Sequence, residues 1–193
     1  MLREILPMGV QVTLALFFAT GAALVQLAST AFSLTSGAFA NNRTIPQVYS
    51  YMGNGCTGHN LSPPLSWTSG PANTESYALT VFDPDARPGV GWWHWVVFDI
   101  PANVMKLAAG SGAGSDALTP KGSIQGRNDF QIVGWGGPCP PPGSPPHHYV
   151  FTLYALDVAQ LYGVSTLTSG PTLLKAMEGH ILAKTTLIGR FGR

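Results

Sequence analysis

The chain has 193 residues, which is enough for one domain with a substantial hydrophobic core. Ten basic and nine acidic residues give a formal net charge of +1 and form no basic patch, which argues against nucleic-acid binding. Only 10% of the residues are charged, whereas 23 are glycine and 16 are proline, and this mixture favours a turn-rich β protein over a helical bundle.

Residues 1–40 have the features of a signal peptide that directs export. A basic N-terminus precedes an apolar run at 10–28, and small residues follow it. Ala38-Phe39-Ala40 fits a cleavage site that would leave 41–193 as a single mature domain, and Ser29-Thr30-Ala31 is a second candidate. The alternative is an uncleaved membrane anchor, because the run is near the length that spans a bilayer. We therefore expect a periplasmic or secreted protein.

Cys56 and Cys139 are the only cysteines, so an exported chain can form just one internal disulfide. An oxidising compartment favours that bond. Two buried free thiols are the alternative, because the sequence alone does not give the distance between the two residues.

The mature chain is predicted to consist mostly of strands separated by glycine- and proline-rich turns. One helix is expected, near the C-terminus. It would start at Ser169 or Gly170, with Pro171 in its first turn and Gly179 beyond its end. In chain order we expect strands at 45–51, 65–67, 76–82 and 94–101, a helical turn at 104–109, strands at 130–133 and 149–157, the helix near 171–178, and a strand at 181–190.

The stretch at 94–101 is predicted to be an inner strand, because both of its faces are largely apolar. Strict alternation would divide its side chains between the two faces of a sheet. One face would carry His94, Val96, Phe98 and Ile100, and the other would carry Trp93, Trp95, Val97 and Asp99.

The sequence contains no short motif of a common enzyme class. It lacks a G-x-S-x-G elbow, a Walker loop and a dinucleotide-binding glycine pattern, so we expect no cofactor. His147 and His148 are neighbours on a strand and should point to opposite faces, and no local metal-ligand spacing is present. A metal site assembled from Asp83, Asp85, His94 and His147 stays possible, although we expect none.

Polar side chains gather at the expected ends of three strands. Asp83 and Asp85 end one strand, His94 starts the next, and His147 and Tyr149 start a third. If these strands are neighbours, the five groups share one rim, where imidazole and phenol groups can donate hydrogen bonds to an oxyanion. We expect Asp85 to orient His94, Asp83 to polarise the rim, and anion affinity to rise as the histidines are protonated near pH 6–7. The alternative is a hydrogen-bonded plug that closes one end of the β core.

Several longer motifs follow one another along the chain. They are Gly55-Cys56-Thr57-Gly58-His59-Asn60-Leu61-Ser62-Pro63-Pro64-Leu65-Ser66-Trp67, Asp83-Pro84-Asp85-Ala86, His94-Trp95-Val96-Val97, Gly136-Gly137-Pro138-Cys139-Pro140-Pro141, His147-x-Tyr149 with Phe151-x-Leu153-Tyr154-Ala155-Leu156-Asp157, and Gly179-His180-Ile181-Leu182-Ala183-Lys184. In this order the motifs resemble the phosphatidylethanolamine-binding protein family, and the opening and closing segments are similar to its bacterial, Raf-kinase-inhibitor-like branch.

The resemblance implies a mainly β fold, with a large antiparallel sheet packed on a smaller one and few helices. It also implies a pocket for phosphate or phosphoryl head groups. Two positions depart from the family pattern: Arg87 stands where relatives usually have proline, and His148 stands where they usually have arginine. Carried over position by position, the pocket would comprise Asp83, Asp85, His94, Pro141, His147 and Tyr149, with Trp92 as a possible wall.

These observations predict an exported protein that binds small anions, such as phosphate or a phospholipid head group, and performs no chemistry. An inhibitor of a kinase or protease, acting through protein–protein contact, is an alternative from a different class. A hydrolase that uses the pocket histidines is a third.

Overall fold

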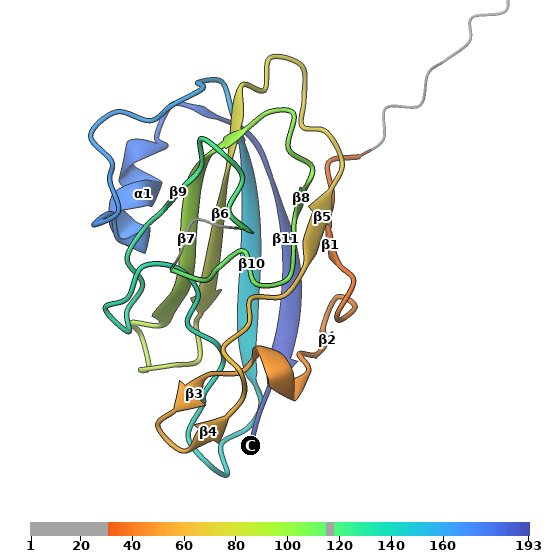
Figure 1. Cartoon of the computed structure of the whole chain (residues 1–193), viewed down its shortest axis with the longest axis vertical. Coiled ribbons are helices and arrows are strands. Elements are labelled where there is room, and N and C mark those ends of the chain that lie inside the picture. The colour runs from red at the N-terminus through yellow and green to blue at the C-terminus, as the bar shows by residue number, and fades with distance from the viewer. Residues whose placement is uncertain (1–30, 115–117) are drawn as a thin grey trace, which may run out of the picture.

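The computed structural model describes residues 31–114 and 118–193, and its largest element is a six-stranded sheet (Figure 1). All neighbouring strands in this sheet are antiparallel except β2 and β11, which pair in parallel. In spatial order the strands are β2 (Arg43–Thr44), β11 (Ile181–Phe191), β10 (His147–Leu156), β6 (Ser76–Asp83), β7 (Trp92–Pro101) and β9 (Ile124–Gln125).

A smaller three-stranded sheet packs on one face of the large sheet, as predicted. It consists of β1 (Leu34–Ser36), β5 (Leu65–Trp67) and β8 (Lys106–Leu107). Apolar side chains from both sheets form one buried cluster, to which the small sheet contributes Leu65 and Trp67 and the large sheet contributes Trp95 and Phe151. This layer is the main hydrophobic core.

The opposite face of the large sheet is covered by helix α1 (Gly170–Ala176) and the loops beside it (Figure 1). The side chain of Ser169 caps the helix by accepting a hydrogen bond from the Thr172 amide, which confirms one of the two predicted starting residues. Leu173 and Met177 are fully buried in a second cluster with Val96 and Phe98 of β7. The inner strands are therefore covered on both faces, as their apolar character predicted.

Three predicted elements are wrong. Residues 45–51 contain only a short 3-10 helix, Gln47–Tyr49, because Ile45 is the one fully buried hydrophobic residue of the segment and no alternating apolar face is buried. The expected helical turn at 104–109 contains β8 instead, which extends the edge of β5 and buries Leu107. Residues 130–133 form a turn rather than a strand, because the Asn128 side chain accepts hydrogen bonds from the amides of Phe130 and Ile132.

Two bulges in β7 overturn the predicted alternation of its side chains. In the pairing of β6 with β7, Val81 lies opposite Trp95 and the next residue, Phe82, lies opposite Trp93. His94, between the two tryptophans, is therefore the extra residue of a bulge. A second shift occurs near Asp99, which has a positive φ of 55°. As a result, Ile100 joins the main core with Trp95 and Val97 rather than the cluster of Val96 and Phe98.

The folded domain begins before Asn41. Strand β1 pairs with β5, and the ring of Phe39 packs in the core with its centroid 5.5 Å from that of Phe151. The apolar run at 10–28 lies outside the described residues, and no helix within them is long and apolar enough to span a bilayer. Cleavage after Ala40 would remove β1 and Phe39, whereas cleavage after Ala31 would leave both in place.

A chain that starts at Asn41 should therefore be less stable than one that starts at Phe32. The shorter chain lacks the buried side chains of Leu34 and Phe39, and its free energy of unfolding should be lower by about 3–6 kcal/mol. Urea unfolding of the two purified chains measures this difference. Equal midpoints and slopes would show that residues 32–40 contribute nothing to the fold.

Candidate functional site

A cavity of about 380 Å³ lies where three adjacent strands of the large sheet reach the same edge. The end of β6 supplies Asp83, the start of β7 supplies Trp92 and His94, and the start of β10 supplies His147 and Tyr149. Because β6 pairs antiparallel with both β7 and β10, these ends coincide. The cavity brings together all seven residues predicted from the sequence: Asp83, Asp85, Trp92, His94, Pro141, His147 and Tyr149.

Asp83 is a buried carboxylate whose two oxygens hold two different segments. Its Oδ1 accepts hydrogen bonds from the amides of Asp85 and Ala86, at 2.9 and 3.0 Å, and so fixes the turn that follows β6. Its Oδ2 lies 2.8 Å from Nδ1 of His147. Asp83 therefore orients an imidazole as well as a turn.

The bulge in β7 turns His94 into the cavity, on the same side of the sheet as Tyr149, whose ring centroid is 5.0 Å away. Nδ1 of His94 bonds to the carbonyl oxygen of Gly136, which can only accept, so Nδ1 carries the proton. Burial lowers the pKa of His94 to about 4, although the Gly136 carbonyl and Asp83 oppose this shift. At neutral pH the ring is uncharged and its Nε2 is a hydrogen-bond acceptor. The expectations that Asp85 orients His94 and that His94 becomes charged near pH 6–7 are therefore wrong.

Asp85 bonds to His148 instead. Its Oδ2 accepts from the backbone amide of His148 at 2.7 Å and lies 2.8 Å from the Nδ1 of the same residue. Burial acts to raise the pKa of Asp85, but the hydrogen bonds and the charge of His148 outweigh it and lower that pKa overall. His148, one of the two departures from the family pattern, thus bonds to Asp85 at the rim, where both side chains are about 40% exposed.

Two hydrogen-bond donors of the cavity lining have no partner among the described residues. They are the hydroxyl of Tyr149 and the Nε1 of Trp92, and both atoms are buried. Burial, the nearby negative charge of Asp83 and an interaction of the hydroxyl with the Asp83 side chain, which falls short of hydrogen-bond geometry, raise the pKa of Tyr149 far above its usual value, so the phenol keeps its proton. A buried donor without an acceptor costs about 1–3 kcal/mol, so these two groups favour an occupant that accepts hydrogen bonds.

Aromatic and cationic side chains form the mouth of the cavity. The guanidinium carbon of Arg87 lies 4.0 Å from the centre of the Trp92 ring. Phe130 packs edge-on against Trp92 and His94 and stacks on Tyr51. The sequence analysis missed Phe130 as a site residue, because it was placed in a strand. The run Asn128-Asp129 before it was the available turn signal.

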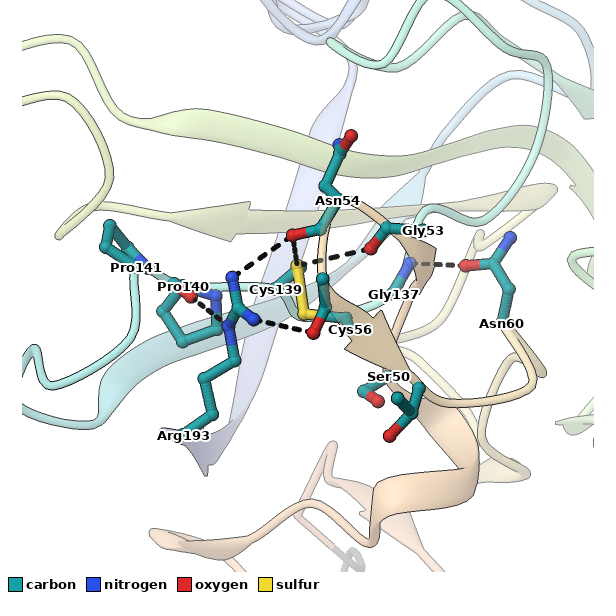
Figure 2. Close-up of a disulfide and its surroundings, with 12 residues drawn as sticks. Ser50, Gly53, Asn54, Cys56, Asn60, Gly137, Cys139, Pro140, Pro141 and Arg193 are labelled. Carbon is teal, nitrogen blue, oxygen red and sulfur yellow. Dashed lines mark hydrogen bonds between the residues drawn. A yellow bond between two sulfur atoms is a disulfide. The ribbon is translucent and has the colours of Figure 1, made fainter.

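A disulfide joins the two loops that form one wall of the cavity (Figure 2). Cys56 and Cys139 are bonded, with Cα atoms 5.9 Å apart, which confirms the predicted pairing. Arg193 lies over the same junction and donates to the carbonyl oxygens of Asn54, Gly55 and Pro140. Closing a loop of 83 residues stabilises a fold by about 4.5 kcal/mol in the chain-entropy view.

The glycines of this wall are required by close packing. A Cβ on Gly136 would lie 2.3 Å from the Phe130 ring, and one on Gly137 would lie 2.4–2.5 Å from the backbone of Tyr49 to Tyr51. Asn128, which is buried, donates to the carbonyls of His94 and Gly134 and so ties this loop to the bulge. No pattern in the sequence distinguished Asn128 from an ordinary turn residue.

The nucleophilic groups that the lining contains are carboxylates, imidazoles and a phenol. The lining includes no serine, threonine or lysine, and Cys139 is held in the disulfide. Within residues 31–114 and 118–193, no three His, Cys, Asp or Glu side chains are arranged to hold a metal ion. The arrangement is suited to holding a ligand through hydrogen bonds and charge.

Comparison with known proteins places this site in a family. A sequence profile described as "Phosphatidylethanolamine-binding protein" matches residues 35–192. The chain belongs to the phosphatidylethanolamine-binding protein family. This confirms the resemblance seen in the sequence motifs.

Relatives and solved structures agree with this membership. The UPF0098 protein YbcL of Escherichia coli K12 is 42% identical over 152 residues, which is 79% of this chain and 80% of YbcL. YbhB of the same organism is 38% identical, over 82% of this chain and 98% of YbhB.

The crystal structure of YbcL, described as a new member of the mammalian PEBP family, matches with a TM-score of 0.81 and 38% identity, over 84% of this chain and 98% of YbcL. A PEBP homologue from Chlamydia trachomatis matches with a TM-score of 0.72 and 38% identity, over 86% of this chain and 99% of that one.

The buried, neutral His94 should make the fold sensitive to acid. Its pKa is lowered from 6.5 to about 4 in the folded chain, so between these values the unfolded chain binds the proton more readily. Above pH 6.5 His94 is neutral in both states and does not lower the free energy of unfolding. As pH falls from 6.5 to 4, that free energy should decrease by about 3 kcal/mol. Chemical unfolding of the wild type and His94→Gln at several pH values measures this loss. Parallel curves for the two proteins in this range would contradict it.

Proposed function

We propose that this protein binds small anions that carry a phosphoryl group, without transforming them. The observation that carries the proposal is the Tyr149 hydroxyl, which is buried in the cavity without an acceptor among the described residues. The family description, phosphatidylethanolamine-binding protein, supports the same class of ligand.

The cavity offers hydrogen-bond donors and acceptors that match a singly protonated phosphate monoester. The Tyr149 hydroxyl and the Trp92 Nε1 can donate to its anionic oxygens. His94 presents its unprotonated Nε2, which can accept from a P–OH group. A dianion has no P–OH, so affinity should rise as pH falls through about 6, near the second pKa of a phosphate monoester. This rise follows from the ligand's protonation, since His94 stays neutral in that range.

Replacing Tyr149 by phenylalanine should weaken phosphate binding without weakening the fold. The lost hydroxyl donates to the anion, and losing a hydrogen bond to a charged group costs about 1.5–3 kcal/mol, or roughly ten- to a hundredfold in affinity. Because that hydroxyl has no hydrogen-bond partner among the described residues, the unfolding midpoint should stay the same or rise. Calorimetric titration with O-phosphorylethanolamine and inorganic phosphate, together with urea unfolding, measures both effects.

Tyr154→Phe is the matched control, because Tyr154 lies on the same strand but in the cluster on the other face of the sheet. Its affinity should equal that of the wild type. A Tyr149→Phe protein that binds as well as the wild type but unfolds more easily would make Tyr149 a structural residue. Absence of phosphate binding by the wild type at millimolar concentrations would leave the polar cluster as a structural plug.

We also propose that the protein is exported and that its leader is removed after Ala31. The apolar run at 10–28 and the small residues after it support export, and so does a disulfide, which persists best in an oxidising compartment. Ala31 is favoured over Ala40 because β1 and Phe39 belong to the folded domain.

The intact mass of the protein recovered from the extracytoplasmic fraction, measured without reductant, tests this proposal. It should correspond to a chain that starts at Phe32 and lacks the two hydrogen atoms of a disulfide. A mature chain that starts at Asn41 would refute the proposed cleavage position. Recovery only in membranes with an intact N-terminus would refute export with cleavage.

A further inference from the structure

The cavity lining has one permanent positive charge. Among its fourteen residues, Arg87 is the sole arginine or lysine. Asp83 and Asp85 bring two carboxylates, and each is matched by one histidine, His147 or His148. Since His94 is neutral, the lining without Arg87 would carry no fixed cation to offset its two carboxylates.

Arg87 is held in an unusual conformation at this place. Its φ is +46°, which is uncommon for a residue with a side chain. Its carbonyl oxygen accepts hydrogen bonds from the amides of Val90 and Gly91, at 2.9 and 3.1 Å, and these close the turn before β7. Strained backbone at a cavity mouth is a reason to look for a function, and here it carries the one permanent positive charge of the lining.

The guanidinium is positioned but not neutralised. It lies over the Trp92 ring, 4.0 Å from the ring centre, and makes no salt bridge with a carboxylate of the described residues. An arginine stacked on an aromatic ring keeps the edge of its planar fork free, and that edge can bind two oxygens of a phosphate or carboxylate. Arg87 is therefore an exposed cation without a carboxylate partner, and it contacts Trp92, which carries one of the two unpartnered donors.

We propose that Arg87 determines the charge of the ligand, so that this cavity selects anionic phosphoryl compounds over neutral polar compounds of similar size. The inference rests on the proposed function and adds Arg87 to the residues that serve it. Arg87 acts at the mouth, whereas Tyr149 and His94 act inside.

Calorimetric titration with inorganic phosphate tests the role of Arg87. Arg87→Gln should weaken binding at least about tenfold and should flatten its dependence on salt, because one charge-assisted contact is lost. Arg87→Lys keeps the charge but loses the planar stack, so its affinity should fall between those of the wild type and Arg87→Gln. Urea unfolding of each variant checks that the fold is retained.

Lys184→Gln is the matched control, because it removes one positive charge from an exposed site that pairs with Tyr154, far along the sheet from the cavity. It should bind phosphate like the wild type. Equal affinities of Arg87→Gln and the wild type would overturn the inference and leave the proposed function standing, and equal losses in Arg87→Gln and Lys184→Gln would overturn it as well. A wild type that does not bind phosphate would overturn both. If Arg87→Gln fails to fold, wild-type affinity that stays constant between about 0.01 and 0.1 M ionic strength would still overturn the inference.

Discussion

The buried carboxylate of Asp83 is the interaction on which the whole cavity depends. One oxygen fixes the turn that carries Asp85 and Arg87, and the other fixes His147 on the neighbouring strand. A carboxylate with 2% of its surface exposed is stable only if both oxygens are satisfied, and here backbone amides and an imidazole satisfy them. Removal of either partner would leave part of the buried Asp83 carboxylate unsatisfied. The turn after β6, the bond between Asp85 and His148 and the start of β10 therefore depend on one another.

The sequence predicted which residues line the cavity more accurately than it predicted how the side chains of β7 alternate between the faces of the sheet. Expected strand ends were enough to bring Asp83, Asp85, His94, His147 and Tyr149 to one cavity, because antiparallel neighbours share an edge, and the family resemblance added Trp92 and Pro141. Alternation failed at His94 and again near Asp99, where a bulge adds one residue to β7. A bulge depends on how the partner strand is paired, and that information is not contained in the period of a single strand. The same bulge turns His94 into the cavity.

The rest of the wall could not be predicted, because it is made by contacts between distant loops. Phe130 reaches the mouth only because Asn128 folds its own loop back and bonds to the carbonyl of His94. The pairing of Cys56 with Cys139 followed from counting the cysteines, but the three carbonyls bound by Arg193 belong to segments far apart in the chain (Figure 2). Contacts made by Asn, Arg and Gly do not follow a periodic pattern in the sequence. They form only when close packing in the folded chain brings distant loops together.

The polar groups of the cavity fall into two sets, one with hydrogen-bond partners among the described residues and one without. The carboxylates of Asp83 and Asp85 are occupied by amides and imidazoles, so their main effect is to hold other groups in place. The Tyr149 hydroxyl and the Trp92 Nε1 have no hydrogen-bond partner among the described residues. The fold would be more stable if these donors were absent or had an acceptor. Three other buried polar atoms, on Trp67, Ser123 and Arg127, also lack a partner among the described residues, but Tyr149 and Trp92 line one cavity together with His94. The phosphoryl ligand proposed above would supply acceptors to both donors, whereas a purely structural plug would leave them without one.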